Sequence, residues 1–216
     1  MNDLVLRQDI LDELGFDPKV EAAHIGVVVD KGVVTLTGHV SNYAEKLAAE
    51  AAVRRVKGVR AVAEELEVRV PNHRKTADDE IATRAADIMS WDSALPKDRI
   101  RITVHGGWLY LEGEVDWQFQ RTAAQERISQ LTGLVGVVNN ITIRNQPVLP
   151  DIRRRIEEAF RRNAEVDAEQ IHVAVHDNGK VVLEGNVHGW SERAAAENAV
   201  WGVSGVTRLE SNLRIV

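Results

Sequence analysis

The sequence predicts an α+β protein of three tandem α-β-β-α-β modules, each a small mixed three-stranded sheet with two helices on one face. A nine-residue pattern occurs three times, as GVVTLTGHV at 32–40, GWLYLEGEV at 107–115 and GKVVLEGNV at 179–187. Glycines recur in register around these patterns, at offsets of 75 and then 72 residues, which indicates internal repeats. They form three columns: Gly32, Gly107 and Gly179; Gly38, Gly113 and Gly185; Gly58, Gly133 and Gly205.

Each repeat begins with apolar residues at helical spacing, which predict a helix. These residues are Leu6, Ile10 and Leu14; Ile81, Ala85 and Ile88; Ile152, Ile156 and Phe160. A short loop and then an alternating apolar strand follow. The predicted inward residues of that strand are Ile25, Val27 and Val29; Ile100, Ile102 and Val104; Ile171, Val173 and Val175.

The segments DKG, GG and DNG then predict hairpin turns, because glycine and asparagine tolerate positive φ. The nine-residue pattern is the returning strand, with inward residues Val34 and Leu36, Leu109 and Leu111, and Val181 and Leu183. Gly38 and its counterparts predict the exit from this strand, where a missing side chain leaves room for the next helix.

An alanine-rich helix follows in each repeat, within 42–56, 117–131 and 189–203. Gly58 and its counterparts are expected just past the helix end, in a left-handed cap. The closing strands lie within 63–70, 138–145 and 209–216, and a right-handed crossover makes each parallel to the strand before it. Backbone geometry explains every glycine column, so the repeated pattern is a folding device.

The three patterns, together with VKGVRAV, LTGLVGV and VSGVTRL downstream, resemble the BON domain family. The resemblance covers three copies, at 1–70, 76–145 and 149–216. It implies a non-catalytic module, as in bacterial osmotically inducible and transport-associated proteins, acting in the cell envelope or in stress responses. The suggested ligand of such modules is a phospholipid surface, and some members are linked to potassium instead.

Composition excludes several classes of function. The 216 residues contain no cysteine, which excludes disulfides, thiol catalysis and cysteine metal sites. The net charge of −6 argues against a nucleic-acid partner. No catalytic motif occurs, so we predict a non-enzymatic protein without cofactor or metal site. The first residues carry no apparent signal peptide. We therefore expect a cytoplasmic protein, and a periplasmic one only if the chain is trimmed from a longer one.

Five aromatic residues occupy positions where the sister repeats mostly have polar or small side chains: Trp91, Trp108, Tyr110, Trp117 and Trp201. Aromatic side chains at solvated positions indicate a contact. Two interpretations remain open, namely packing between repeats or between copies of the chain, and contact with an external ligand.

The segment RRRIEEAFRR carries five arginines, Arg153, Arg154, Arg155, Arg161 and Arg162. On a helix they would meet anionic lipid at about 1 kcal/mol per basic residue. Glu157 and Glu158 lie among them, so the second interpretation is a solvated, self-paired face.

The sequence thus predicts a non-enzymatic binding module that contacts anionic phospholipid or membrane surfaces in a bacterial stress or envelope-related role. The first alternative is a soluble sensor of a cation, with potassium first, or of a small ligand. The second alternative is a structural, self-assembling interaction protein, with a protein partner or a homo-oligomer as its contact.

Overall fold

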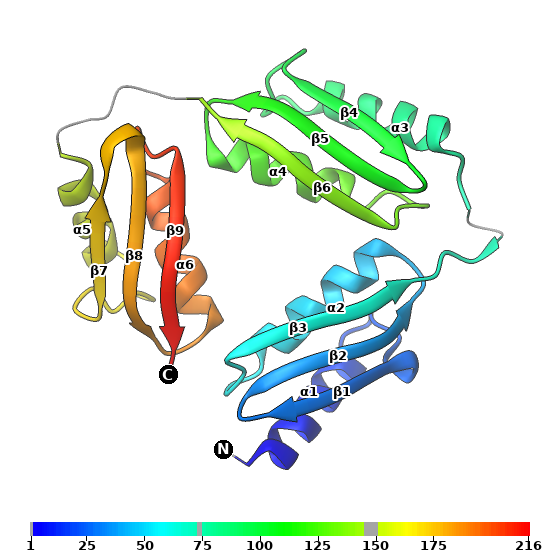
Figure 1. The fold of residues 1–216 in the computed structure, drawn as a ribbon, viewed down its shortest axis with the longest axis horizontal. Helices are drawn as coiled ribbons and strands as arrows, with labels where there is room; N and C mark the ends of the chain where they lie inside the picture. Colours follow the sequence, from blue (N-terminus) through cyan, green and yellow to red (C-terminus); the bar gives the residue numbers. More distant parts are fainter. Residues whose placement is uncertain (1, 73–74, 145–150) are drawn as a thin grey trace. The chain divides into compact units, whose positions relative to one another are not determined.

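The computed structural model describes residues 2–72, 75–144 and 151–216, and the chain divides into two compact units, 1–142 and 143–216. The first unit holds two α-β-β-α-β repeats and the second unit holds the third (Figure 1).

The elements follow the predicted order in each repeat. The first repeat contains α1 (Asp3–Phe16), the 3-10 turn η1 (Ala22–His24), β1 (Ile25–Asp30), β2 (Val33–Val40), α2 (Tyr43–Arg55) and β3 (Ala61–Val68). The second contains α3 (Asp78–Trp91), β4 (Ile100–His105), β5 (Trp108–Val115), α4 (Gln118–Ile128) and β6 (Gly136–Ile143). The third contains α5 (Ile152–Arg162), β7 (Ile171–Val175), the 3-10 turn η3 (Asp177–Gly179), β8 (Lys180–Val187), α6 (Trp190–Trp201) and β9 (Arg208–Ile215).

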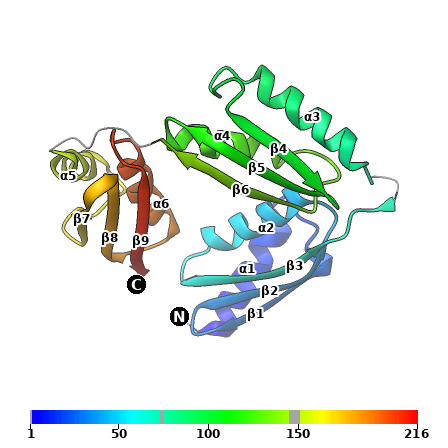
Figure 2. The ribbon, with the colours of Figure 1, turned by 45° about the horizontal axis from the view of Figure 1, so that its top comes forward.

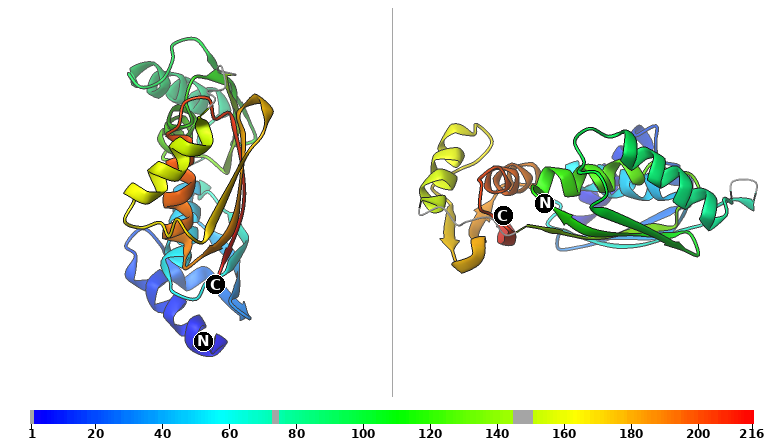
Figure 3. Two further views of the ribbon diagram at one scale, coloured as in Figure 1. Left: turned by 90° about the vertical axis from the view of Figure 1, so that its left-hand side faces the viewer. Right: turned by 90° about the horizontal axis from the view of Figure 1, so that it is seen from above.

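Each repeat has its own three-stranded sheet, in which the hairpin's second strand lies in the middle. β2 runs antiparallel to β1 and parallel to β3, and β8 does the same between β7 and β9. Both helices of a repeat cover one face of its sheet (Figures 2 and 3). The predicted fold class is confirmed.

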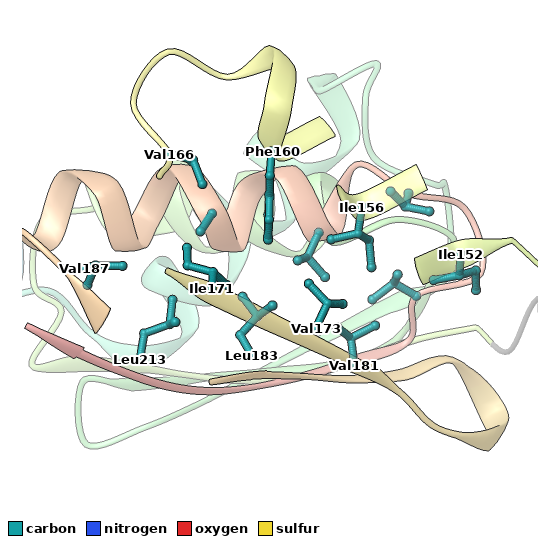
Figure 4. Close-up of a cluster of buried hydrophobic side chains, with 14 of the residues drawn as sticks. Ile152, Ile156, Phe160, Val166, Ile171, Val173, Val181, Leu183, Val187 and Leu213 are labelled. Atoms are coloured by element: carbon teal, nitrogen blue, oxygen red, sulfur yellow. The ribbon is translucent and has the colours of Figure 1, made fainter. Parts of the chain in front are cut away.

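The core of each repeat lies between its helix pair and the inward face of its sheet. In the third repeat, Phe160 of α5 points toward Val173 and Leu183 of the sheet (Figure 4), and all three side chains are buried. The predicted apolar residues of α1 and α5 are buried as expected. In the second repeat the inward residues of β4 are only half-buried, so its core is less completely covered.

The glycine column of the middle strands has a different role from the one expected. Gly38, Gly113 and Gly185 lie within β2, β5 and β8, and each strand continues two residues further. The predicted strand exit is therefore wrong. A Cβ built on Gly38 would lie 2.1 Å from the carbonyl oxygen of His24, the residue that precedes β1. The glycine is needed because two main-chain segments approach closely there.

The glycine column after the second helix also differs from the prediction. Gly58, Gly133 and Gly205 have positive φ values, but they stand three to five residues beyond the last helical residue and do not cap the helix. A Cβ on Gly179 of the hairpin would lie 1.9 Å from the Gly205 carbonyl oxygen, and one on Gly32 would lie 2.9 Å from that of Gly58. The glycines of the hairpin turn therefore lie against the glycines of the loop that follows the second helix.

An acceptor side chain at one position of the second helix binds loop amides in every repeat, and it is buried in the first and third repeats. Glu45 accepts hydrogen bonds from the amides of Glu21 and Ser41, at 2.9 Å each. Glu192 accepts from Asp167 and His188 at 2.9 and 2.7 Å. In the second repeat the acceptor is neutral. There Gln120 accepts hydrogen bonds from the main-chain amides of Asp116 and Trp117.

Burial alone would raise the pKa of the Glu192 carboxyl. The hydrogen bonds from His188 and Asp167 outweigh burial and hold this pKa below its usual value. Glu192 is therefore ionised in the folded protein at neutral pH.

Candidate interaction surfaces

Within the described ranges, no group of three or more His, Cys, Asp or Glu side chains is placed to hold a metal ion. In the same residues, no helix combines the length and the apolar character needed to cross a membrane. The candidates that remain are exposed surfaces, beginning with the arginine-rich helix.

Ion pairs along α5 hold three of its five arginines. Arg153 Nε lies 2.8 Å from Glu157 Oε1, and Arg154 pairs with Asp151 and Glu158 at 2.8 and 2.9 Å. Arg155 Nε lies 3.1 Å from Asp151. Hydrogen bonds from Arg155 and then Arg154 hold the pKa of the Asp151 carboxyl below its usual value. This part of the helix is largely neutralised by its own carboxylates.

The last two arginines of α5 are placed differently. Arg161 and Arg162 are exposed at the C-terminal end of the helix, and within residues 151–216 neither has an ion pair. They are the part of the arginine cluster that is available to an external anion.

Trp108 and Tyr110 share the outward face of β5, two residues apart on one strand. The Trp108 ring lies across the sheet over Gly136 of β6, where a Cβ would come within 2.5 Å of the ring. Trp108 is 43% exposed and Tyr110 is half-buried. The pair forms an aromatic patch on the uncovered face of the second sheet.

Trp117 and Trp201 are less accessible. Trp117 is half-buried and directly precedes α4. Trp201 is half-buried against the core of the third repeat. The solvated position expected for Trp201 is therefore wrong, because its side chain packs against this core.

Tyr43, an aromatic residue of the first repeat, contacts the second repeat. Burial raises the pKa of the Tyr43 phenol, and its hydrogen bond with the main chain of Val137 opposes that rise. Tyr43 belongs to α2 and Val137 to β6. Packing between repeats of the first unit thus uses Tyr43.

Trp91 and Phe16 are the two most exposed large hydrophobic residues in the described chain, at 87% and 83%. They are also equivalent, because each is the last residue of the first helix of its repeat, followed by an aspartate as C-cap. In the third repeat that position is Arg162. One corner of the fold, the C-terminal end of the first helix, therefore carries Phe16 in the first repeat, Trp91 in the second and Arg162 in the third. The equivalence of Phe16 and Trp91 is visible in the sequence, because the two residues are separated by the 75-residue offset of the repeats.

The aspartates beside the two aromatic residues are neutralised. Asp17 pairs with Arg55 at 3.0 Å, and Asp92 pairs with Arg127 at 3.2 Å. A hydrogen bond from the Lys19 amide, and then Arg55, hold the pKa of Asp17 below its usual value. Each exposed ring therefore lies beside a compensated carboxylate.

Comparison with known proteins identifies the family of the chain. No curated protein matches the chain. Two solved structures are of CdsD, a structural protein of the type III secretion system of Chlamydia trachomatis, one of them its C-terminal domain. The two are 15% and 14% identical, with TM-scores of 0.27 and 0.28. They cover all of this chain, which covers 93% and 100% of theirs. The BON domain model matches residues 2–70, 77–145 and 149–216, and the chain belongs to the BON domain family.

Proposed function

We propose that this chain is a non-enzymatic binding protein that contacts anionic phospholipid surfaces through the ends of the first helices of its BON domains. The observation that carries the proposal is the equivalent, almost fully exposed position of Phe16 and Trp91. Covering a side chain of this kind contributes about 1.5–3 kcal/mol, and aromatic rings favour the membrane–water interface. Stable attachment at a membrane usually needs a second signal beside an apolar one.

The second signal is cationic. Arg161 and Arg162 occupy the corresponding corner of the third repeat, and basic residues near an anionic surface contribute about 1 kcal/mol each. Arg153, Arg154 and Arg155 contribute less, because their charges are already compensated on the helix. The bacterial stress or envelope-related role and the cytoplasmic location belong to the proposal as well.

Vesicle flotation tests the aromatic contact. We expect binding to vesicles that contain phosphatidylglycerol and none to vesicles of phosphatidylcholine alone. Phe16→Ser and Trp91→Ser should each weaken binding about tenfold. The matched control is Phe119→Ser, which removes a ring that is 57% exposed on α4. Absence of flotation at low salt, or an equal loss in the control, would contradict the proposal.

Paired and unpaired arginines test the cationic contact. We expect Arg161→Gln with Arg162→Gln to reduce flotation and its salt dependence more than Arg153→Gln with Arg154→Gln. Two charges are removed in each double variant, so net charge is matched. If both double variants lose binding equally, the effect is that of overall charge and the corner has no special role.

Self-assembly is the alternative that one observation favours. Each three-stranded sheet has two edge strands, and each edge strand pairs on one side only within its own sheet. The unpaired side of such a strand pairs readily with another chain. Light scattering over a range of protein concentrations tests it. The potassium alternative rests on family resemblance, and a melting shift in potassium compared with sodium tests it.

A further inference from the structure

The second helices carry a basic residue at the same position in all three repeats: Lys46, Arg121 and Arg193. In the first repeat the Lys46 ammonium lies 2.8 Å from Glu64. In the third, Arg193 Nε lies 2.8 Å from Glu197. These two repeats thus provide the cation with a carboxylate of their own.

The second repeat replaces both kinds of carboxylate by amides. Asn139 stands where the first repeat has Glu64, and Gln125 stands where the third has Glu197. The two amides bond to each other, with Asn139 Nδ2 donating to Gln125 Oε1 at 3.2 Å. Among the described residues, the Arg121 guanidinium makes one hydrogen bond, from Nη2 to the Asn139 carbonyl oxygen at 3.5 Å, and no ion pair. A half-buried guanidinium is left without a counter-charge.

Arg121 lines a pocket of about 410 Å³ formed by α4, Asn139 of β6 and Leu47 of α2; α4 and β6 lie together in Figure 1. Most of the lining is polar and uncharged. Gln118 is one lining residue, and its Oε1 is buried without a hydrogen-bond partner in the described structure. The one carboxylate of the lining, Glu126, is exposed and forms no ion pair with Arg121.

We propose that this pocket binds the oxyanion group of a small polar ligand, a phosphate or a carboxylate, with Arg121 as its main contact. A guanidinium presents five donors in a plane that matches two oxygens of such a group. The pocket has the volume of a small-molecule site. A hydroxyl on the same ligand would satisfy Gln118 Oε1. The inference is independent of the lipid contact proposed for Phe16 and Trp91.

Titration of the full chain with inorganic phosphate and with succinate, at constant ionic strength against chloride, tests the proposal. Isothermal calorimetry and amide shifts in two-dimensional NMR should show saturable binding in the wild type, with shifts in α4 and β6. Gln125→Glu and Asn139→Glu each return a carboxylate that a sister repeat carries, so both variants should fold. Each should pair with Arg121 and weaken binding at least about tenfold.

The control is Arg193→Gln, which removes the equivalent guanidinium that is already paired, and binding should be unchanged. The proposal is overturned if neither probe binds saturably, if both glutamate variants bind as the wild type does, or if Arg193→Gln loses binding equally. Flotation of Gln125→Glu identifies the source of the oxyanion. Loss of vesicle binding as well as phosphate binding points to a lipid headgroup, and loss of phosphate binding alone points to a soluble ligand.

Discussion

Replacing Gly113 by alanine separates the two reasons for which this fold uses glycine. Gly106 and Gly113 lie in the same repeat and both have positive φ, 57° and 139°. At Gly106 an added Cβ meets nothing within 4 Å, whereas at Gly113 it would lie 2.0 Å from the Arg99 carbonyl oxygen. The first substitution tests backbone conformation alone, and the second tests conformation together with close approach.

The expected magnitudes differ accordingly. Alanine in the left-handed region costs about 1–2 kcal/mol, so Gly106→Ala should lose about that much. The φ of Gly113 is far from the left-handed helical value of about 57°, and an alanine held at such a φ is strained by about 1–3 kcal/mol. Relieving the contact also requires the main chain before β4 to move by more than an ångström, because ordinary contact begins at 3.4 Å. The total is about 3–5 kcal/mol, close to the whole stability of a small domain.

Urea unfolding of the full chain, followed by hydrogen exchange and mass spectrometry, measures the effect repeat by repeat. In Gly113→Ala we expect the second repeat to exchange rapidly while the third keeps its protection. Gly106→Ala should shift the urea midpoint only modestly. Equal destabilisation by the two substitutions would refute the reasoning, because it would show that the main chain before β4 yields freely.

Three further predictions concern single contacts. The folded pKa of Glu192 is below the unfolded one, so its stabilisation is present above pH about 4.5 and is lost as pH falls through the folded pKa. Glu192→Gln should therefore make the urea midpoint of the third repeat less dependent on pH in the acid range. The variant should still fold, since Gln120 is the acceptor at the equivalent position of the second repeat. Asp78→Ala should cost about 1–2 kcal/mol and speed amide exchange at the hairpin glycines that it binds at 2.7 and 3.0 Å. Gly136→Ala should displace Trp108 and shift its fluorescence to the red.

The fold could be predicted because its determinants are local and repeated. The residues Leu6, Ile10 and Leu14 are all buried, and the hairpin glycines have the positive φ that their turns require. The roles of Gly38 and Gly58 were predicted wrongly because each faces a main-chain oxygen or turn distant in the sequence. A glycine column shows that a side chain is excluded, and only the structure shows what excludes it.

The candidate site was less predictable, since exposure depends on how each helix ends. Trp91 and Trp201 both stand at the end of a helix, yet Trp91 is 87% exposed and Trp201 packs against a core. The exposure of Phe16 could not be predicted, because a single aromatic residue after an apolar helix resembles one more core residue. The 75-residue offset alone identifies Phe16 as the counterpart of Trp91.

Partner replacement is a better guide to function here than composition. The arginine-rich α5 is the most basic segment, but Arg153, Arg154 and Arg155 find carboxylates three or four residues away. Arg121 is unremarkable in the sequence, since its sister repeats also carry a basic residue there. What distinguishes it is the loss of a partner: the oxygens that would neutralise it have become amides in the second repeat alone. Amides at those positions still form hydrogen bonds within the fold, but they leave the positive charge of Arg121 without a counter-charge. We therefore expect the chain to bind an anion at the position where the other two repeats form an internal ion pair.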